Sequence, residues 1–442
     1  MKRISFLVAV AFASAPAVAA DLLSVYREAQ LSDAVYASAK AQFIAAQELL
    51  PQSRALLRPN ANFQAGANWN SIDTEYDNSF FASGSREYYD YTYGINVTQP
   101  LYRPQNNIAV EQAKIQMAQA GNQLSVAEQD LMLRVSQAYF DVLLARAELQ
   151  TIRTQKTAVA EQLEQAKRNF VVGIATITDS REAQARYDLV VAQELVAENA
   201  LEVRQRALEQ IVGRPVGELS GLAAPIALNP PQPADMDAWV QQAYQSSLQV
   251  ALNQQAVELA AREIDRASAG HKPTLDAVGS LTQNYSESSP QGIGSDVRAF
   301  VVGVQLNIPL YQGGAISSRT REAVANQERA RQDLENARRS VALQTRQAYL
   351  GVTSGLGQVK ALEQAVASTE LQLESTKLGQ EVGVRTAVDV LNAEQQLSIA
   401  RRDLAQALYN TILSQLQLKA AVGKLAEADL ADVNRLFTGN TP

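Results

Sequence analysis

Hydrophobic side chains recur along this chain with two different periods, one typical of helices and one typical of strands. The helical period is clearest over residues 149–170 and 359–380, where the apolar positions advance by three and four residues. This spacing predicts a seam between helices packed as a coiled coil. In the second half the seam consists of Val359, Leu362, Val366, Thr369, Leu373, Thr376 and Gln380.

The first helical stretch is long. From about Leu101 to Phe170 no proline follows Pro104. At about 1.5 Å per residue, this stretch predicts a helix of about 100 Å. Because a helix of that length is longer than the diameter of a compact globular domain, the pattern predicts a rod or the wall of a tube.

The strand period marks four segments, which are residues 60–70, 89–98, 274–284 and 298–308. Their polar positions carry small or amide side chains with few charges, and about ten residues suits a tilted membrane strand. Tyrosines cluster as an interfacial girdle requires, at Tyr88, Tyr89, Tyr91 and Tyr93. A soluble β-sandwich would also alternate, but these features favour a transmembrane barrel. Four strands are too few to close one and lipid tolerates no open edge, so subunits must share it.

Two short interruptions of the helical pattern resemble one another. Residues 171–185 read VVGIATITDSREAQA and residues 381–395 read EVGVRTAVDVLNAEQ, with the matching residues 210 positions apart. A glycine ends one helix in each, where a left-handed backbone is needed, and a Thr-x-x-Asp capping box opens the next. We therefore predict two helical hairpin tips, whose turn and cap residues are Gly173, Thr176 and Asp179, then Gly383, Thr386 and Asp389.

Arg385 does not fit this local explanation. It places a cation beside the amino terminus of a helix, where the helix dipole disfavours positive charge. Either a carboxylate from elsewhere pairs with Arg385 or the side chain points into water, and the local pattern allows both.

The shared interruptions indicate that one structural unit occurs twice. Pro100-Leu101-Tyr102 also returns as Pro309-Leu310-Tyr311. We predict a signal peptide at residues 1–20, a first repeat at 21–212 with its tip near 173–179, a Pro/Gly linker at 213–235, a second repeat at 236–423 with its tip near 383–389, and a C-terminal tail at 424–442.

The amino-terminal residues predict secretion. Lys2 and Arg3 precede an apolar run, and an Ala-x-Ala motif predicts cleavage near Ala19 or Ala20. A membrane anchor would need about 18 to 20 continuous apolar residues, which Pro16 interrupts. Removing Lys2 and Arg3 takes the net charge from −7 to −9, which argues against nucleic-acid binding.

The composition also restricts the chemistry. The chain has no cysteine, so it has no disulfide, thiolate metal site or amino-terminal lipid-bearing cysteine, and His271 is its only histidine. Histidine-based catalytic triads and multi-histidine metal sites are therefore excluded in practice. No pair of carboxylates is selected by its spacing, so we expect no enzyme, no metal and no cofactor.

Three stretches together resemble the TolC family, the outer-membrane channels of Gram-negative efflux and type I secretion systems. They are GHKPTLDAVGSLTQ at 270–283, FVVGIATITD at 170–179 and the run from VGVRTAVDVLNAEQQ to AAVGKL at 382–425. The resemblance implies a mixed α and β membrane protein. It implies a homotrimer with a twelve-stranded barrel in the outer-membrane lipid, four strands per protomer, continued into the periplasm by a long α-helical coiled-coil barrel.

The resemblance also assigns roles at the tips. It implies that Arg385 of one protomer binds Asp179 and the neighbouring Thr178 of the next protomer and so holds the entrance closed. Asp389 corresponds to an acidic ring that selects cations. Asn392 replaces the aspartate of a second ring, and Gln380 replaces a tyrosine of the closed entrance, so these two positions depart from the family pattern.

The function implied is a passive exit duct in the cell outer membrane, with a periplasmic adaptor and an inner-membrane transporter of the RND, ABC or MFS type as partners. The cargo stays open between drugs and a secreted protein. A periplasmic coiled-coil scaffold or adaptor without a pore is the alternative. It accounts for the seams and the signal peptide of the chain but leaves the alternating strands without a role.

Overall fold

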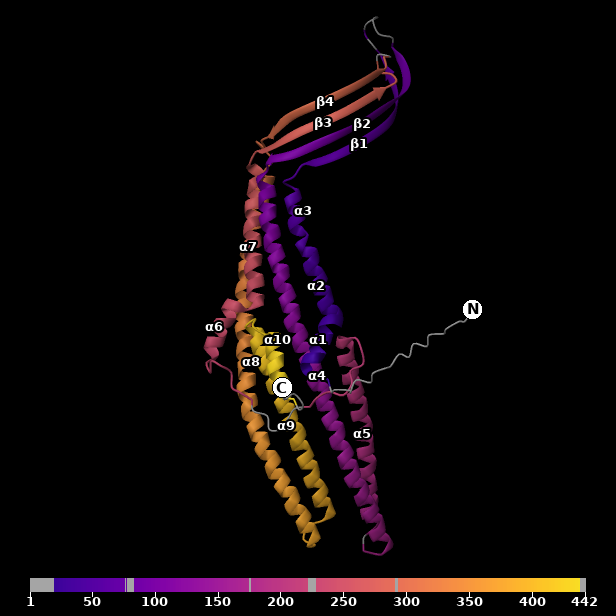
Figure 1. Ribbon diagram of the computed structural model, residues 1–442, viewed down its shortest axis with the longest axis vertical. Coiled ribbons are helices and arrows are strands. Elements are labelled where there is room, and N and C mark those ends of the chain that lie inside the picture. The colour runs from indigo at the N-terminus through magenta and orange to yellow at the C-terminus, as the bar shows by residue number, and fades with distance from the viewer. Residues whose placement is uncertain are drawn as a thin grey trace, which may run out of the picture. The chain divides into compact units, whose positions relative to one another are not determined.

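The structure is a computed structural model, and it describes residues 20–75, 77, 83–174, 176–221, 228–290 and 293–437. The predicted signal peptide therefore lies outside the described residues, apart from Ala20. The longer helices and the strands follow the chain in the order of Figure 1. They are α1 (Leu22–Ser32), α2 (Ala34–Gln47), α3 (Leu49–Ala55), β1 (Asn60–Thr74), β2 (Gly84–Tyr102), α4 (Pro104–Val171), α5 (Ile177–Val212), α6 (Met236–Ser246), α7 (Leu248–Ser268), β3 (Thr274–Ser286), β4 (Ser295–Asn307), α8 (Ala315–Glu381), α9 (Ala387–Ala421) and α10 (Glu427–Asn434).

The chain divides into two compact units, and neither is one of the predicted repeats. One unit comprises Met1–Lys40, Leu124–Val250 and Arg338–Pro442, and the other comprises Ala41–Gln123 and Ala251–Ala337. Each unit takes segments from both halves of the sequence. The reason within the second unit is the sheet, because β2 from the first half pairs with β3 from the second half.

The four strands form one antiparallel sheet in the order β1-β2-β3-β4, which leaves β1 and β4 at its edges. The strands differ in extent from the alternating segments. In particular β2 runs from Gly84 to Tyr102, so the long helix begins at Pro104 and not at the predicted Leu101. Pro100 is accommodated within β2 because the β2–β3 register shifts between Pro100 and Tyr102.

An ion pair holds the start of the long helix to the sheet. Arg103, which precedes α4, donates from Nε and Nη2 to the two carboxylate oxygens of Asp276 in β3, at 2.8 and 2.6 Å. Asp276 is only 7% exposed. This bidentate geometry fixes both the distance and the orientation of the two groups.

The long helices α4 and α8 contain 68 and 67 residues, and at about 1.5 Å per residue each is about 100 Å long. The predicted seam of α8 is buried or half-buried at every position from Val359 to Gln380, whereas most residues between these positions are exposed. Within the unit that contains the tips, ion pairs join the antiparallel partners. Lys156 of α4 pairs with Glu194 of α5 at 2.5 Å, and Lys377 of α8 pairs with Glu394 of α9 at 3.0 Å.

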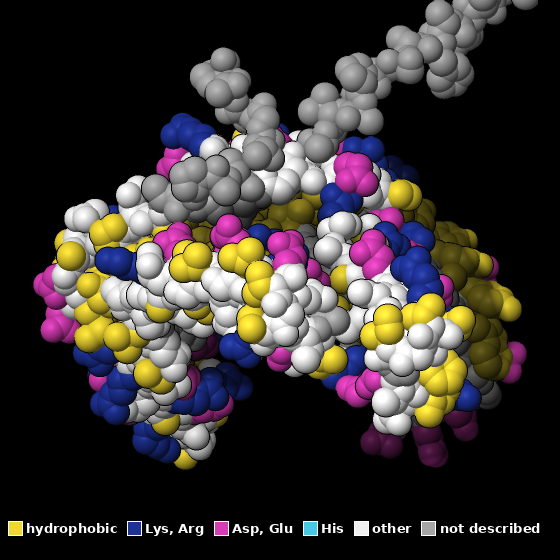
Figure 2. Space-filling view, turned by 90° about the horizontal axis from the view of Figure 1, so that it is seen from below, with side chains coloured by type: hydrophobic (Ala, Val, Ile, Leu, Met, Phe, Trp, Pro, Cys, Tyr) yellow, Lys and Arg dark blue, Asp and Glu magenta, His cyan; other side chains and the backbone are white. Residues whose placement is uncertain are grey.

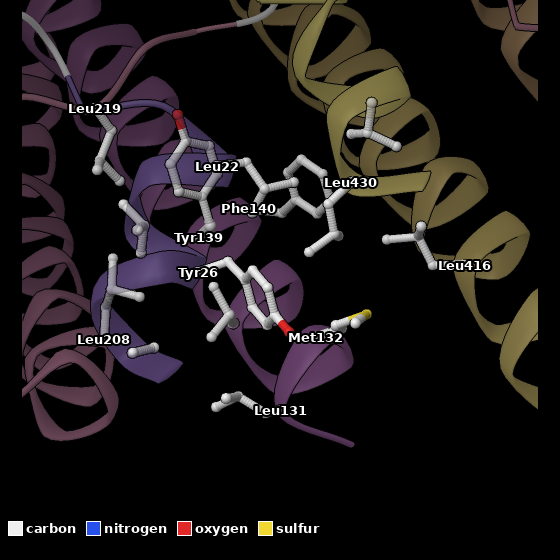
Figure 3. Close-up of a cluster of buried hydrophobic side chains, with 14 of the residues drawn as sticks. Leu22, Tyr26, Leu131, Met132, Tyr139, Phe140, Leu208, Leu219, Leu416 and Leu430 are labelled. Carbon is white, nitrogen blue, oxygen red and sulfur yellow. The ribbon is translucent and has the colours of Figure 1, made fainter. Parts of the chain in front are cut away.

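A cluster of buried hydrophobic side chains belongs to the same unit and joins α1, α2, α4, α5, α9 and α10 (Figure 3). Tyr139 of α4 is fully buried, and its ring lies edge-on to Phe437 with the centroids 5.4 Å apart. Its hydroxyl donates to the carbonyls of Ala20 and Ser220 at 3.1 and 2.7 Å. The buried tyrosine thus satisfies its one polar group on the backbone of two loop residues.

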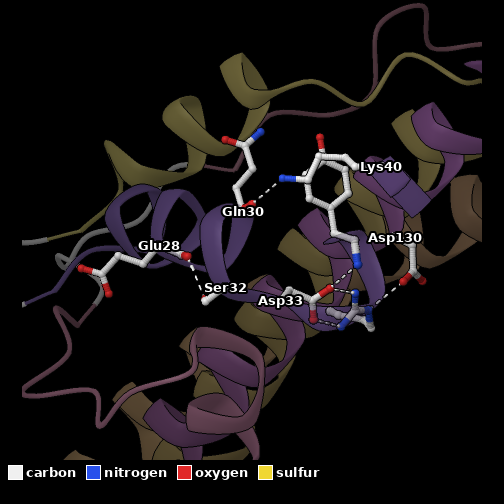
Figure 4. A network of polar contacts seen from close by, with 8 residues as sticks. Glu28, Gln30, Ser32, Asp33, Lys40 and Asp130 are labelled. Carbon is white, nitrogen blue, oxygen red and sulfur yellow. Dashed lines mark hydrogen bonds and ion pairs between the residues drawn. The ribbon is translucent and has the colours of Figure 1, made fainter. Parts of the chain in front are cut away.

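A polar network lies beside this core (Figure 4). Asp33 separates α1 from α2 and accepts a hydrogen bond from the backbone nitrogen of Tyr36 at 2.7 Å, which caps α2. Both its oxygens also accept from Arg134 of α4 at 3.0 Å, and Arg134 bonds Asp130 at 2.7 Å. The network therefore ties the short amino-terminal helices to the long helix.

Candidate functional site at the helical hairpin tips

The first tip is a tight turn between α4 and α5. Gly173 has φ of +79°, a left-handed conformation that only glycine adopts without strain. The backbone nitrogens of Gly173 and Ile174 donate to the carbonyls of Phe170 and Asn169 at 3.0 and 2.8 Å. These bonds provide donors for carbonyl groups in the last turn of α4. The second tip repeats the arrangement, with Gly383 at φ of +82° and Val384 bonded to the carbonyl of Gly379 at 2.9 Å.

A capping box opens the helix that follows each tip. In the first box the backbone nitrogen and the hydroxyl of Thr176 both donate to Asp179 Oδ2 at 2.8 Å, and the Asp179 nitrogen donates back to Thr176 Oγ1 at 3.3 Å. In the second box Thr386 and Asp389 make the same three bonds at 2.9, 2.9 and 3.2 Å. The two tips are therefore alike down to the individual hydrogen bonds.

Each box uses only one oxygen of its carboxylate. Both bonds from Thr176 go to Oδ2 of Asp179, and both bonds from Thr386 go to Oδ2 of Asp389. The backbone bond from the threonine, followed by its hydroxyl bond, lowers the pKa of each carboxyl, so both groups are anions near neutral pH. An anion whose Oδ1 is not used by the cap can accept a further donor without loss of the cap.

Arg385 makes no ion pair with any residue that the structure describes. Its backbone nitrogen donates to the carbonyl of Gly379 at 3.0 Å. Its side chain lies against the same glycine, because a Cβ at position 379 would stand 2.8 Å from Arg385 Cγ. Gly379 therefore sets the position of Arg385, and sequence reasoning missed it because the residue carries no functional group.

The other predicted residues lie at the same tips. Thr178 is exposed on the first turn of α5, next to Asp179. Gln380 is half-buried near the end of α8, and Asn392 is exposed on α9, one turn beyond the half-buried Asp389. Within one chain the structure thus collects these residues at two tips, but it does not join Arg385 to Asp179.

The first hairpin and the start of α9 enclose a small cleft of about 190 Å³. It is lined by Gln162, Gln165, Ala166 and Asn169 of α4, by Asp179, Glu182, Ala183 and Arg186 of α5, and by Val388 of α9. Figure 2 shows basic and acidic side chains interspersed over the surface seen from below. Since neither sign of charge forms a continuous field there, individual pairs matter more than a general attraction.

The family model for outer membrane efflux proteins matches residues 25–214 and again residues 239–424. The chain belongs to this family. Among characterised members, it is 37% identical to the outer membrane protein TolC of Vibrio cholerae, with 94% of this chain and 93% of the relative covered. It is also 32% identical to TolC of Escherichia coli, with 95% of this chain and 85% of the relative covered.

Solved structures of outer-membrane channels share the fold of this family member. The Campylobacter jejuni channel CmeC aligns over 94% of this chain and 89% of its own, with a TM-score of 0.79 and 14% identity. The Vibrio cholerae protein VceC aligns over 91% and 96%, with a TM-score of 0.74 and 19% identity. This outer-membrane efflux protein thus has the mixed helical and sheet architecture of those channels.

In the part of the chain that the structure describes, no helix has both the length and the apolar character to cross a membrane. Over the same residues, no three His, Asp or Glu side chains are grouped as metal ligands.

Proposed function

We propose that this outer-membrane efflux protein is the passive exit duct of a tripartite efflux pump and of type I protein secretion. Both uses have support among its relatives. Besides the TolC proteins, the chain is 30% identical over 99% of its length to the proteases secretion protein PrtF of Dickeya chrysanthemi. The proposal rests mainly on one observation. In a single chain, a four-stranded sheet with two open edges continues into two helices of 68 and 67 residues.

The open edges support a homotrimer. β1 and β4 each leave one row of backbone donors and acceptors unpaired within the sheet. In lipid such an edge must be closed, because no water is present to form hydrogen bonds with its backbone N–H and C=O groups. Pairing of β4 with β1 of the next copy closes the sheet, and three copies give a barrel of twelve strands.

The gate of this duct is an ion pair between neighbouring chains. We assign Arg385 as the donor and Asp179, with the adjacent Thr178, as its partner on the next protomer. Arg385 has no ion pair among the described residues, and Oδ1 of Asp179 is not used by the capping box. The cap and the gate can therefore use the same carboxylate at once. Gln380, half-buried near the second tip, adds an amide to the closed entrance.

Cation selection at the entrance is assigned to Asp389. Its pKa is lowered by the bonds from Thr386, so each of its copies is charged at neutral pH. Asn392, one turn further along α9, is uncharged and adds no second ring of charge. The entrance therefore selects cations through one acidic ring.

A passive duct neither supplies energy nor chooses its cargo, so it needs partner proteins that do both. A periplasmic adaptor and an inner-membrane transporter of the RND, ABC or MFS type supply the energy and choose the cargo. The family is one of transport channels, and we assign this chain no catalytic activity, cofactor or metal.

Single-channel conductance in a planar bilayer tests both the pore and the gate. We expect a small, cation-selective conductance for the mature wild-type protein and a clearly larger one for Arg385→Ser. Arg401→Ser is the matched control, since Arg401 already pairs with Glu370 within its own hairpin at 2.6 Å. Its conductance should stay at the wild-type value.

The possible outcomes separate the two parts of the proposal. Absence of conductance in every variant would exclude the pore and favour the periplasmic scaffold. Equal conductance of the wild type and Arg385→Ser would keep the pore and exclude the gate at Arg385. Asp179→Asn, which keeps an acceptor for the Thr176 nitrogen but removes the charge, should conduct like Arg385→Ser.

A further inference from the structure

One face of the sheet changes in character between two neighbouring rows of residues, because amide and charged side chains appear only in the second row. Phe63, Ile95, Leu281 and Phe300 lie side by side across β1, β2, β3 and β4 in the paired register. Two residues further along each strand, the next row on this face is Ala65, Tyr93, Gln283 and Arg298. In the proposed barrel this face meets lipid, because its side chains are large and apolar while those of the other face are mostly small or polar.

The row that contains Gln283 and Arg298 lies toward the outer surface of the membrane. The strand ends beyond it, at Thr74 and Gly84 and at Ser286 and Ser295, are joined by loops. The opposite ends of the strands lead into helices, which the proposed function places in the periplasm. Arg298 thus lies where the apolar band ends in the outer leaflet, at the depth of the lipid headgroups.

The guanidinium of Arg298 has no close hydrogen-bond acceptor among the residues that the structure describes. The side chain is 75% exposed, and its one carboxylate contact among the described residues is Asp296, with Nη2 and Oδ2 4.0 Å apart. Asp296 is itself held by the Gln283 side-chain amide, whose Nε2 donates to Oδ1 at 2.9 Å. An arginine on a lipid-facing surface needs an anion, and a phosphate matches its planar donors through two parallel hydrogen bonds.

The same face also has room for a hydrocarbon chain. A shallow hollow of about 440 Å³ lies over the small side chains of Ala65 and Ala67, with Tyr91, Tyr93 and Tyr285 along it. The rings of Tyr91 and Tyr285 have their centroids 6.1 Å apart. Small residues beside tyrosines at the headgroup depth leave a groove with apolar walls and polar rims.

We propose that this face binds a phosphorylated glycolipid of the outer leaflet, with its phosphate on Arg298 and an acyl chain in the hollow over Ala65 and Ala67. The proposal rests on the proposed function, because it requires the sheet to form a barrel in the outer membrane. The negative charge of Asp296 repels the phosphate and limits the affinity of the site for the lipid. Replacing Asp296 with a neutral residue should therefore strengthen lipid binding.

Binding of purified lipid A to the full-length protein in detergent tests the proposal, measured by native mass spectrometry with phosphorylated and dephosphorylated lipid A as the two probes. Arg298→Gln should bind phosphorylated lipid A about fivefold more weakly, as expected for the loss of one cation at a membrane surface. Asp296→Asn should bind it more tightly. Arg331→Gln, which removes a similarly exposed arginine from α8, should leave binding unchanged.

Three results would overturn the proposal. They are equal binding of the two lipid A forms by the wild type, unchanged binding in Arg298→Gln, or equal binding of phosphatidylglycerol, which would remove the preference for a glycolipid. The conductance of the same preparations distinguishes the two levels of inference. A protein that conducts but ignores lipid phosphate contradicts only the lipid site, whereas a protein that neither conducts nor inserts contradicts the proposed function.

Discussion

Asp33 shows how a single side chain joins three helices. It is 5% exposed, it caps α2 through Tyr36, and it receives two hydrogen bonds from Arg134 of α4. The Arg134 hydrogen bond is the main cause that lowers the pKa of the Asp33 carboxyl, and burial acts against it. The charged form is therefore the one that the folded protein stabilises.

This lowered pKa predicts a stability that depends on pH. The unfolded carboxyl has an ordinary pKa near 4 and takes up its proton first as the pH falls. The contribution of Asp33 is complete above that pKa and is lost as the pH falls through the lower, folded value. Asp33→Asn keeps an acceptor for Tyr36 but loses the charge, and we expect it to cost about 1 to 3 kcal/mol at neutral pH.

Urea unfolding of the full chain between neutral pH and about pH 3 measures this contribution. The difference between wild type and Asp33→Asn should shrink toward the acid end. Asp432→Asn removes an exposed carboxylate that pairs with Arg435 just after the end of the same helix, and it should change the free energy of unfolding little at any pH. A difference for Asp33→Asn that is constant across the pH range would contradict the assignment.

Residues whose partners are near in sequence were predictable, and residues with distant partners were not. The two Thr-x-x-Asp boxes act within four residues, so the pattern alone predicts their bonds. The bond between Asp33 and Arg134 spans about one hundred positions and leaves no periodic signal. Gly379 is an exception, because it lies only six positions from Arg385 and was missed since it has no side chain that would mark the contact.

At the scale of elements, the helix seams were predictable because their period is local, whereas strand ends were not. The alternating pattern ends at residue 98, yet β2 continues to Tyr102. Pairing with β3 extends the strand, and the register shift beside Pro100 absorbs the residue that cannot donate. Strand ends are thus decided by the neighbouring strand, which the sequence of β2 alone does not contain.

The two tips predict opposite effects of glycine replacement in turns and in helices. Gly383→Ala forces a left-handed backbone on alanine at φ of +82°, which costs about 1 to 2 kcal/mol and should loosen the second tip. Gly357 lies inside α8, where an added Cβ would meet no atom within 4 Å. Gly357→Ala should therefore stabilise α8 by about 0.5 to 1 kcal/mol.

Hydrogen exchange resolved by peptide is the measurement for both variants. Gly383→Ala should speed exchange over residues 376–392, with Gly173→Ala as the matched variant at the first tip. Gly357→Ala should slow exchange in its own part of α8. Unchanged exchange at the tip of Gly383→Ala would show that the positive φ is not required there.

At the scale of the whole molecule, the repeat in the sequence and the compact units of the structure differ because the sheet joins the two halves. β2 and β3 come from different repeats and pair over most of their length. A repeat alone has only two strands, which are marginally stable by themselves. The same argument extends beyond one chain, because four strands leave two edges that lipid does not tolerate.

Closure between chains is testable because the protein contains no cysteine. Within one chain β1 and β4 are separated by β2 and β3, or about 14 Å between the edge strands, which is too far for a disulfide. A cysteine at Gln64 of β1, combined in turn with one at Val301, Gly303 or Gln305 of β4, can therefore react only between chains. All four positions lie on the face opposite the predicted lipid contact.

We expect at least one of these pairs to give an oxidant-dependent trimer on a denaturing gel, since a closed ring of three chains is the largest product that the proposed barrel allows. Each single-cysteine variant serves as the control and should stay monomeric on the same gel, because one cysteine per chain would have to meet its own copy. A ladder that ends at the dimer for every pair would contradict closure by three chains. A ladder that continues beyond the trimer would indicate open-ended strand pairing, which a barrel in a membrane does not permit.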